Sequence, residues 1–249
     1  MEKLVYLVWA PDRIAKDRAA IRDLLLEECG PKLLGLGPKR LVVHVGDPES
    51  KMNNPMPFGP KDPPQISGSV DLWVDAVDQR GPFEKVLTEA GFKICGYQVE
   101  ESIYRDYGGN PHSGPRTWAD GERSPGVTVI TLLERPKRLD YDEWIKRWHG
   151  VMSPVSEAIQ PRTRYVRNRI LRPVTEGALA IDGIVAEMWP STRHCENPFL
   201  FFGAGLNPVK LAVNMAKILG AVTNFHDLMR VRTAPVSEYF LKTDFEKRA

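Results

Sequence analysis

The hydrophobic residues of this chain form the same series of patterns in each half. In the first half, an aliphatic and aromatic strand precedes a helix with regularly spaced apolar positions, and a second apolar strand follows. The second half repeats this order. The predicted elements cover residues 3–11, 12–29 and 40–46 in the first half, and 126–136, 139–160 and 163–174 in the second. We therefore expect one structural unit to occur twice.

The spacing of the elements supports the same interpretation. Val5 and Leu41 lie 36 positions apart, as do Val129 and Tyr165. A third and a fourth strand follow in each half, at 69–77 and 97–104 and at 179–189 and 234–241. Each half then has the order strand, helix, strand, strand, helix, strand, which is typical of a ferredoxin-like unit.

A ferredoxin-like sheet has one face that its own helices leave uncovered, and an uncovered apolar face must be buried. We therefore predict an α+β fold in which two tandem ferredoxin-like (βαββαβ) halves pack as a barrel-like pseudo-dimer, with a cavity between the sheets. The predicted boundaries are 1–107 for the first half and 127–249 for the second. Residues 108–126, rich in Gly, Pro and polar side chains, form the predicted linker.

Two connections differ between the halves. In the first half, residues 47–68 join the second and third strands and are dense in Pro, which disfavours regular structure. This segment is either a surface loop or a lid over the cavity. In the second half, the connection between the third and fourth strands is 26 residues longer and carries an apolar insertion at about 195–228.

The insertion contains a predicted helix from Pro208 onward. Its apolar residues recur at helical spacing, at Val209, Ala212, Val213, Ala216, Leu219 and Gly220. Such a helix covers the barrel or forms a subunit contact in a homodimer. It lacks the face rich in Lys and Arg that surface-bound membrane helices carry, so we expect no membrane partner.

The composition argues against several classes of function. Among the 249 residues, 34 Lys and Arg oppose 32 Asp and Glu, and a net charge of +2 does not indicate a nucleic-acid partner. Cys29, Cys95 and Cys195 lie far apart without a CxxC pair, so a disulfide framework is not predicted. The histidines show no HExxH or HxH spacing, and we predict no metal site. A signal-peptide pattern is lacking at Met1, and we expect a cytoplasmic protein.

One helix carries a histidine that the core does not need. Asp140 and Glu143 resemble a capping box, which starts the helix at about Tyr141. His149 lies at the margin of an apolar face formed by Tyr141, Trp144, Ile145, Trp148 and Met152. The matching position in the first half is Leu25, so the fold does not require an imidazole there. His149 is therefore either a structural group near the helix end or a catalytic one.

The second half resembles the EthD domain, a subgroup of the dimeric α+β barrel superfamily. The resemblance rests on "DEWIKRWHGVMSP", "RYVRNRI" and "IDGIVAEMW" within residues 127–189, and on the final "APVSEYFLK". It implies that the pseudo-dimer is an intramolecular dimeric α+β barrel. The first half is similar to a divergent copy that lacks the helix histidine and the Asp-Gly pair, which argues against a second equivalent site.

Relatives of the EthD domain include enzymes that decarboxylate, dehydrate or cyclise polyketide and aromatic compounds without a cofactor. The resemblance implies a cofactor-independent lyase, cyclase or isomerase that acts on an aromatic or polyketide-like compound by acid–base chemistry. His149 is the candidate base, and Tyr165 or Asn168 is the candidate donor to an oxyanion. The candidate ligand contacts are Trp144, Trp148, Asp182, Glu187, Trp189 and His44.

Two alternatives stay open at this point. Tyr165 and Asn168 point to opposite faces of their strand, and so do Asp182 and Glu187 on theirs, so only one of each pair lines a given cavity. The second alternative concerns function. A non-catalytic carrier of a hydrophobic metabolite would need the same aromatic wall but no titratable group.

Overall fold

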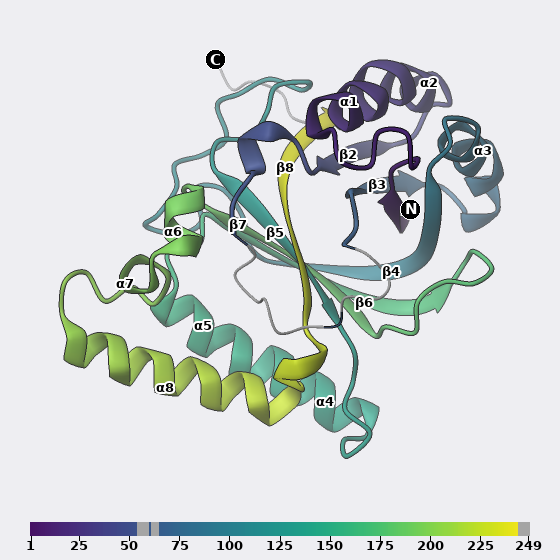
Figure 1. Ribbon diagram of the computed structural model, residues 1–249. Coiled ribbons are helices and arrows are strands. Elements are labelled where there is room, and N and C mark those ends of the chain that lie inside the picture. The colour runs from purple at the N-terminus through teal and green to yellow at the C-terminus, as the bar shows by residue number, and fades with distance from the viewer. Residues whose placement is uncertain (54–59, 61–64, 244–249) are drawn as a thin grey trace.

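The computed structural model describes residues 1–53, 60 and 65–243 (Figure 1). Within these residues, eight strands close into one barrel, and each strand pairs antiparallel with both neighbours. The strands are β1 (Glu2–Trp9), β2 (Arg40–Val45), β3 (Gly68–Val74), β4 (Lys93–Arg105), β5 (Val127–Leu133), β6 (Arg164–Pro173), β7 (Gly183–Trp189) and β8 (Arg232–Lys242). Part of the predicted Pro-rich loop, at 54–59 and 61–64, lies outside the described residues.

Round the barrel the strands follow the order β1, β3, β2, β8, β5, β7, β6, β4. The four strands of the first half are therefore contiguous, as are the four of the second half. Each set has the same internal order, in which its fourth strand lies beside its first, followed by its third and second. The two sets join where β2 pairs with β8 and where β4 pairs with β6. Both halves thus complete a single closed sheet.

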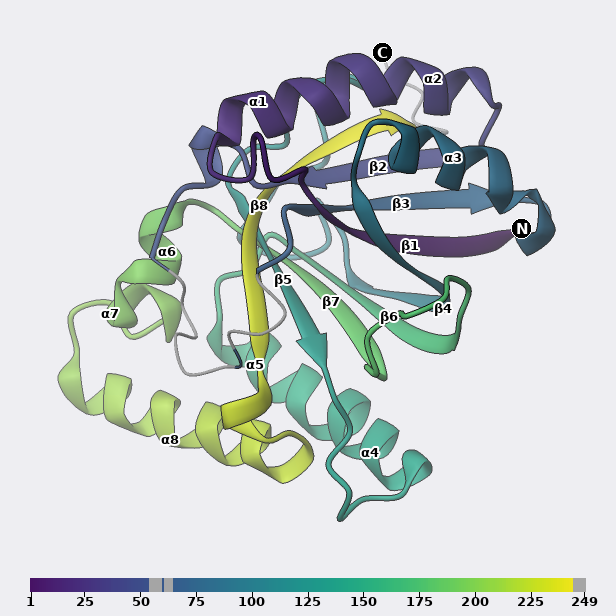
Figure 2. The ribbon, with the colours of Figure 1, turned by 45° about the vertical axis from the view of Figure 1, so that its right-hand side comes forward.

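Helices cover the outer faces of the barrel at opposite ends of the molecule (Figure 2). The first half carries α1 (Arg18–Asp23), α2 (Gly30–Gly35) and α3 (Gly81–Glu89). The second half carries α4 (Tyr141–Arg147), α5 (Ser153–Ile159), α6 (Thr192–Glu196), α7 (Pro198–Phe201) and α8 (Pro208–Phe225). Each outer face is apolar and is buried by these helices, as the two-layer packing of amphipathic elements requires.

A π-helical segment interrupts the first long helix of each half. The segment η1 (Leu24–Cys29) joins α1 to α2, and η4 (Trp148–Met152) joins α4 to α5. The helix predicted over 139–160 is therefore observed, and its N-cap is Asp140, whose carboxylate accepts a hydrogen bond from the Glu143 amide at 2.8 Å. The position of the π segment agrees with the predicted match between the halves.

The predicted register of the first strand in each half is wrong by one residue. Val5 packs inside the barrel with Leu7 and Tyr97, whereas the matched Val129 faces outward against Trp189. A strand alternates its side chains with a period of two, so a shift of one residue exchanges the two faces.

Buried charges occupy part of the space between the two halves. Lys3 lies 2.9 Å from Asp71 and 2.7 Å from Glu101, with 4% of its side chain exposed. Farther round the barrel, Arg164 lies 2.8 Å from Glu238. Together with apolar side chains of β1, β4, β5 and β8, these ion pairs lie in the region where a cavity was predicted. The candidate site described below lies outside the barrel.

The helix predicted from Pro208 is α8, but its buried face differs from the predicted one. The side chains that pack inward are Asn214, Ile218, Ala221 and Phe225, and the predicted apolar stripe is exposed. The helix is apolar around most of its circumference, with Lys210 and Lys217 as its charged residues, so the pattern did not identify the buried face. Among the helices of the described residues, none combines the length and apolar character needed to cross a membrane.

Candidate functional site

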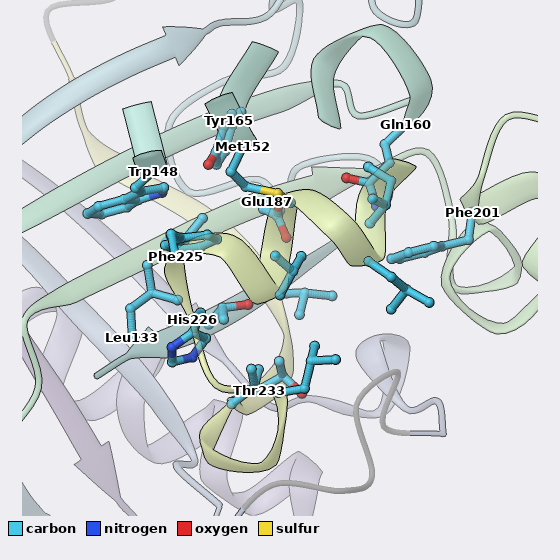
Figure 3. Close-up of a pocket in the computed structure, with 18 of the residues that line it drawn as sticks. Leu133, Trp148, Met152, Gln160, Tyr165, Glu187, Phe201, Phe225, His226 and Thr233 are labelled. Carbon is cyan, nitrogen blue, oxygen red and sulfur yellow. The ribbon is translucent and has the colours of Figure 1, made fainter. Parts of the chain in front are cut away.

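A cavity of about 150 Å³ lies between the second half of the barrel and the helices that cover it (Figure 3). Outward-facing side chains of β5, β6 and β7 form one wall, and η4, α7, α8 and the segment after α8 form the other. The lining is mainly aliphatic and aromatic. Its polar members are Thr131, Gln160, Tyr165, Glu187, His226 and Thr233. An apolar cavity of this size is large enough for one aromatic ring.

His226 directly follows α8 and is 2% exposed. Its Nδ1 lies 3.0 Å from the backbone carbonyl oxygen of Glu134. A carbonyl oxygen can only accept, so Nδ1 carries the proton and donates it. The other nitrogen, Nε2, is then an unprotonated acceptor, and it has no hydrogen-bond partner among the described residues. Such an imidazole can accept a hydrogen bond or a proton from a bound molecule.

The surroundings of His226 keep it neutral. Burial lowers the pKa of His226 to about 4, and the charge of Arg230 acts in the same direction. The bond to the Glu134 carbonyl and the carboxylate of Asp227 raise the pKa, but by less than burial lowers it. At pH 7 the ring is therefore in its proton-accepting form. An anion formed in the cavity would favour the imidazolium, because an adjacent opposite charge offsets the cost of burial.

Glu134 fixes both the ring of His226 and the segment that follows it. Its carbonyl orients the imidazole, as described above. Its carboxylate binds Arg230 at 2.6 Å and Arg232 at 3.4 Å. Arg230 belongs to the short turn η5 (Leu228–Arg230), and Arg232 begins β8. The position of the histidine therefore depends on side chains from outside the cavity.

On the sheet side of the cavity, Glu187 forms an ion pair with Arg162. Arg162 is 1% exposed, donates to Ser156 Oγ at 2.8 Å and stacks over the ring of Tyr165, with 3.9 Å between its guanidinium carbon and the ring centroid. The pair balances a buried cation with a carboxylate, which avoids the cost of an unpaired charge. The cavity wall thus carries a carboxylate that is fixed in place.

The hydroxyl of Tyr165 is already engaged. Ser153 Oγ donates to the carbonyl of Trp148 at 3.1 Å, so its single hydrogen is used. Tyr165, whose hydroxyl lies 3.3 Å from Ser153 Oγ, must then donate to it. Arg167 donates to the same oxygen at 3.0 Å. Tyr165 lines the cavity, but its proton points toward Ser153 at the start of α5 and not toward a ligand.

Trp148 reaches the cavity because its neighbour on β7 has no side chain. A Cβ built at Gly183 would lie 2.9 Å from Cη2 of the Trp148 ring, closer than real Cβ contacts. On its other side, Trp148 faces Phe225 of α8, with 6.5 Å between the ring centroids and an angle of 7°. The tryptophan is thereby held between sheet and helix.

Four of the nine residues predicted for the site line the cavity, namely Tyr165, Trp148, Glu187 and Trp189. Trp144 is fully buried beside Trp148, with 5.1 Å between the ring centroids, and does not line it. Asp182 lies just before β7, where it accepts a hydrogen bond from the backbone of Arg135 at 2.8 Å. Neither residue lines this cavity.

His149, the predicted base, lies beside the cavity and is not part of its lining. Burial, together with Arg167 and Arg169, lowers its pKa to about 4, and Glu100 opposes this shift. Its Nε2 has no hydrogen-bond partner within the described part of the chain. Its ring packs against the Trp148 ring with 4.7 Å between centroids. His149 is part of η4, and the observed ring contact is with its neighbour Trp148.

His44 and Asn168 face the barrel interior, away from the cavity. His44 Nδ1 lies 3.1 Å from Ser69 Oγ, and its Nε2 lies 3.5 Å from Glu238. Asn168 is 1% exposed and alternates along β6 with the outward-facing Arg167. Tyr165 therefore lies on the side of the outer cavity, whereas Asn168 lies on the side of the barrel interior.

Sequence reasoning missed His226 and Gln160. Both occupy the ends of helices, and neither belongs to an apolar stripe or a spaced motif. A usable signal for His226 was its position directly after the inward-facing Phe225, at the end of a helix that only the second half contains. Among the residues at 1–53, 60 and 65–243, no group of three or more His, Cys, Asp or Glu side chains could hold a metal ion.

Comparison with solved structures identifies the fold. An anthrone oxidase-like protein superposes with a TM-score of 0.57 at 11% identity, covering 100% of this chain and 97% of that one. The chain has the fold of a dimeric α+β barrel. A proposed monooxygenase from Fusobacterium nucleatum gives 0.47 at 10% identity, with coverage of 97% and 93%. A mutant chlorite dismutase from Candidatus Nitrospira defluvii gives 0.44 at 6%, with coverage of 96% and 90%.

Comparisons of the sequence do not assign the chain to a family. The sequence matches no protein-family model and no curated protein. None of the three structures above is described as an EthD protein, so the resemblance to that domain stays a prediction.

Proposed function

We propose that this chain is a small-molecule enzyme that removes a proton from an aromatic or polyketide-like substrate, with His226 as the base. The observation that carries the proposal is the unpartnered Nε2 of a buried, neutral imidazole on the wall of an apolar cavity. The name of the anthrone oxidase-like structure also suggests an aromatic substrate. We also propose that the two halves are tandem ferredoxin-like units and that the second is an EthD-like domain.

The chemistry follows from the surroundings of His226. The Glu134 carbonyl fixes the tautomer, so that Nε2 of this cavity-lining residue keeps an unprotonated lone pair. When the substrate loses a proton to Nε2, an imidazolium and a substrate anion form as an adjacent pair. Their attraction in an apolar cavity is stronger than in water, which offsets the burial cost of each charge. Because imidazole transfers a proton and no electrons, we propose a lyase, cyclase or isomerase reaction without a cofactor.

The proposal can be tested without knowledge of the natural substrate. The probe is 2-indanone, in which a benzene ring is fused to an enolisable cyclic ketone. In D₂O, removal of a proton next to its carbonyl leads to deuterium incorporation, which NMR measures directly. We expect the protein to accelerate this exchange and His226→Gln to lower the rate by about 10²- to 10⁴-fold, the usual contribution of a positioned base.

A matched control is His149→Gln, which replaces a second histidine with a similarly lowered pKa outside the cavity lining. This variant should exchange at the wild-type rate. Equal rates in His226→Gln and the wild type would refute the assignment of the base. If 2-indanone binds but its exchange is no faster than in buffer, the cavity belongs to the alternative, a carrier protein without catalysis.

A further inference from the structure

Gln160 places an unpartnered amide in the wall of the cavity. It follows the last residue of α5, and its backbone amide donates to the Ser156 carbonyl at 2.8 Å. The residue is 4% exposed, and its side chain is directed into the cavity (Figure 3). Among the described residues, no group bonds to this carboxamide. A buried amide without a partner is costly, so the carboxamide is available to a bound molecule.

Glu187 adds an acceptor to the lining of the same cavity. Arg162, two residues after Gln160, binds Oε1 of Glu187, and the amide of Thr163 donates to the carbonyl of Met188 at 2.8 Å. These bonds keep the chain after α5 alongside β7. Within the described ranges, Oε2 of Glu187 accepts no hydrogen bond, and the side chain is 19% exposed. His226 lies on the other side of the cavity from Gln160 (Figure 3).

We propose that Gln160 and Glu187 form a hydroxyl-recognition site opposite His226, so that the ligand is an aromatic compound with a hydroxyl group on its ring. A hydroxyl both donates and accepts. It can donate to Glu187 Oε2 and accept from the amide nitrogen of Gln160. A carbonyl cannot donate to the carboxylate, and a carboxylate would be repelled by it. The combination therefore selects a hydroxyl over other oxygen groups.

This inference rests on the proposed function for the position of the reacting group. His226 would take the proton at one end of the ring system, and the hydroxyl would set the orientation from the other end. Gln160 and Glu187 are specificity determinants in this scheme, because they contact the ligand away from the reacting atom. A site built to bond a hydroxyl discriminates strongly against an analogue that lacks it, because its own polar groups then stay unpaired.

The test compares the dissociation constants of 2-indanone, 4-hydroxy-2-indanone and 5-hydroxy-2-indanone, measured by isothermal titration calorimetry. We expect one hydroxylated compound to bind the wild-type protein at least tenfold more tightly than 2-indanone. The variant Gln160→Met keeps the length of the side chain, breaks no ion pair and should reduce this ratio to about threefold or less. The variant Glu187→Gln replaces the carboxylate and should also reduce it, with thermal unfolding as the check that the variant is folded.

Thr131→Val is the matched control, since it removes another hydroxyl from the lining without touching the proposed pair. It should retain the wild-type ratio. Equal affinities for all three compounds, or an unchanged ratio in Gln160→Met, would overturn the inference. His226→Gln should slow deuterium exchange but leave the ratio intact. If His226→Gln exchanged deuterium at the wild-type rate while the affinity ratio was preserved, the proposal of His226 as the base would fail and the hydroxyl site would stand. The two proposals can therefore fail separately.

Discussion

At the scale of single residues, His226 and His149 both lie where the imidazolium is disfavoured. Burial is the largest cause in each case, and it lowers both pKa values to about 4. In the unfolded chain a histidine has a pKa near 6.5. Between about pH 4 and pH 6.5 the histidine binds a proton in the unfolded state but not in the folded state. The folded state therefore loses stability as the pH falls from about 6.5 toward 4.

This difference in pKa predicts that acid destabilises the folded protein and that replacing the histidine removes part of the effect. For His226, the free energy of unfolding should fall by up to about 3 kcal/mol between pH 6.5 and pH 4. In His226→Gln that part of the loss should disappear, whereas at pH 7 no such difference arises from protonation. Urea unfolding at pH 7, 5.5 and 4.5 measures the effect. Parallel curves of stability against pH for the variant and the wild type would contradict it.

At the scale of elements, the ion pair of Arg162 and Glu187 ties the chain after α5 to β7 beside the cavity. Arg162 is nearly inaccessible to solvent, and removal of its partner would leave a buried cation with Ser156 and Glu157 as its remaining polar contacts. Breaking a buried pair from one side is much more damaging than replacing both members. The attachment of α5 should therefore show strong coupling between the two residues.

A double-mutant cycle tests this coupling. We expect Glu187→Met and Arg162→Met each to cost about 3 to 5 kcal/mol of unfolding free energy. The double variant should cost clearly less than the sum of the two, because both single variants remove the same ion pair. Chemical denaturation of all four proteins provides the values. Additive costs would mean that the two side chains stabilise the molecule independently.

The elements that sequence reasoning predicted correctly are those with strong local signals. Asp140 caps a helix, and the strand around Val129 is rich in Val, Ile and Leu. The faces of elements were harder to predict. The exposed Val213 and the buried Ile218 lie on the same apolar helix, and tertiary packing decides between them. His226 was missed for the same reason, since its place in the cavity depends on which face of α8 is buried.

At the scale of the whole molecule, the two halves depend on each other for their sheet edges and for their inner faces. Pairing of β2 with β8 and of β4 with β6 covers the edges that each half would otherwise expose. Contacts between neighbouring segments of different halves, such as those of Asp47, which accepts hydrogen bonds from Ser237 at 2.7 Å and Tyr239 at 2.9 Å, are ones that neither half makes alone. The sequence predicted this association from the uncovered faces, whereas the cavity outside the barrel was not predicted. Strand alternation alone cannot show which charged side chains lie between the sheets.

Mutual dependence predicts that neither half folds alone. A fragment of residues 1–107 would expose Val5, Leu7 and Tyr97 together with two unpaired strand edges. We expect it to lack a cooperative thermal transition by circular dichroism and to aggregate. Mixing it with a fragment of residues 108–249 should restore the transition. A soluble first fragment with a sharp transition of its own would refute the prediction.

The close approach of Trp148 to Gly183 has a consequence for engineering. Trp148 keeps its position because Gly183, on the strand beneath it, lacks a Cβ. A substitution at Gly183, which does not line the cavity itself, should therefore change the cavity volume by moving Trp148. In Gly183→Ala the added methyl group should push the indole toward Phe225 and shrink the space. The variant should then prefer 2-cyclopentenone, a single small ring, over 2-indanone by a larger margin than the wild type does, as competition binding would reveal. The absence of a side chain at Gly183 of β7 thus determines how large a ligand the cavity accepts.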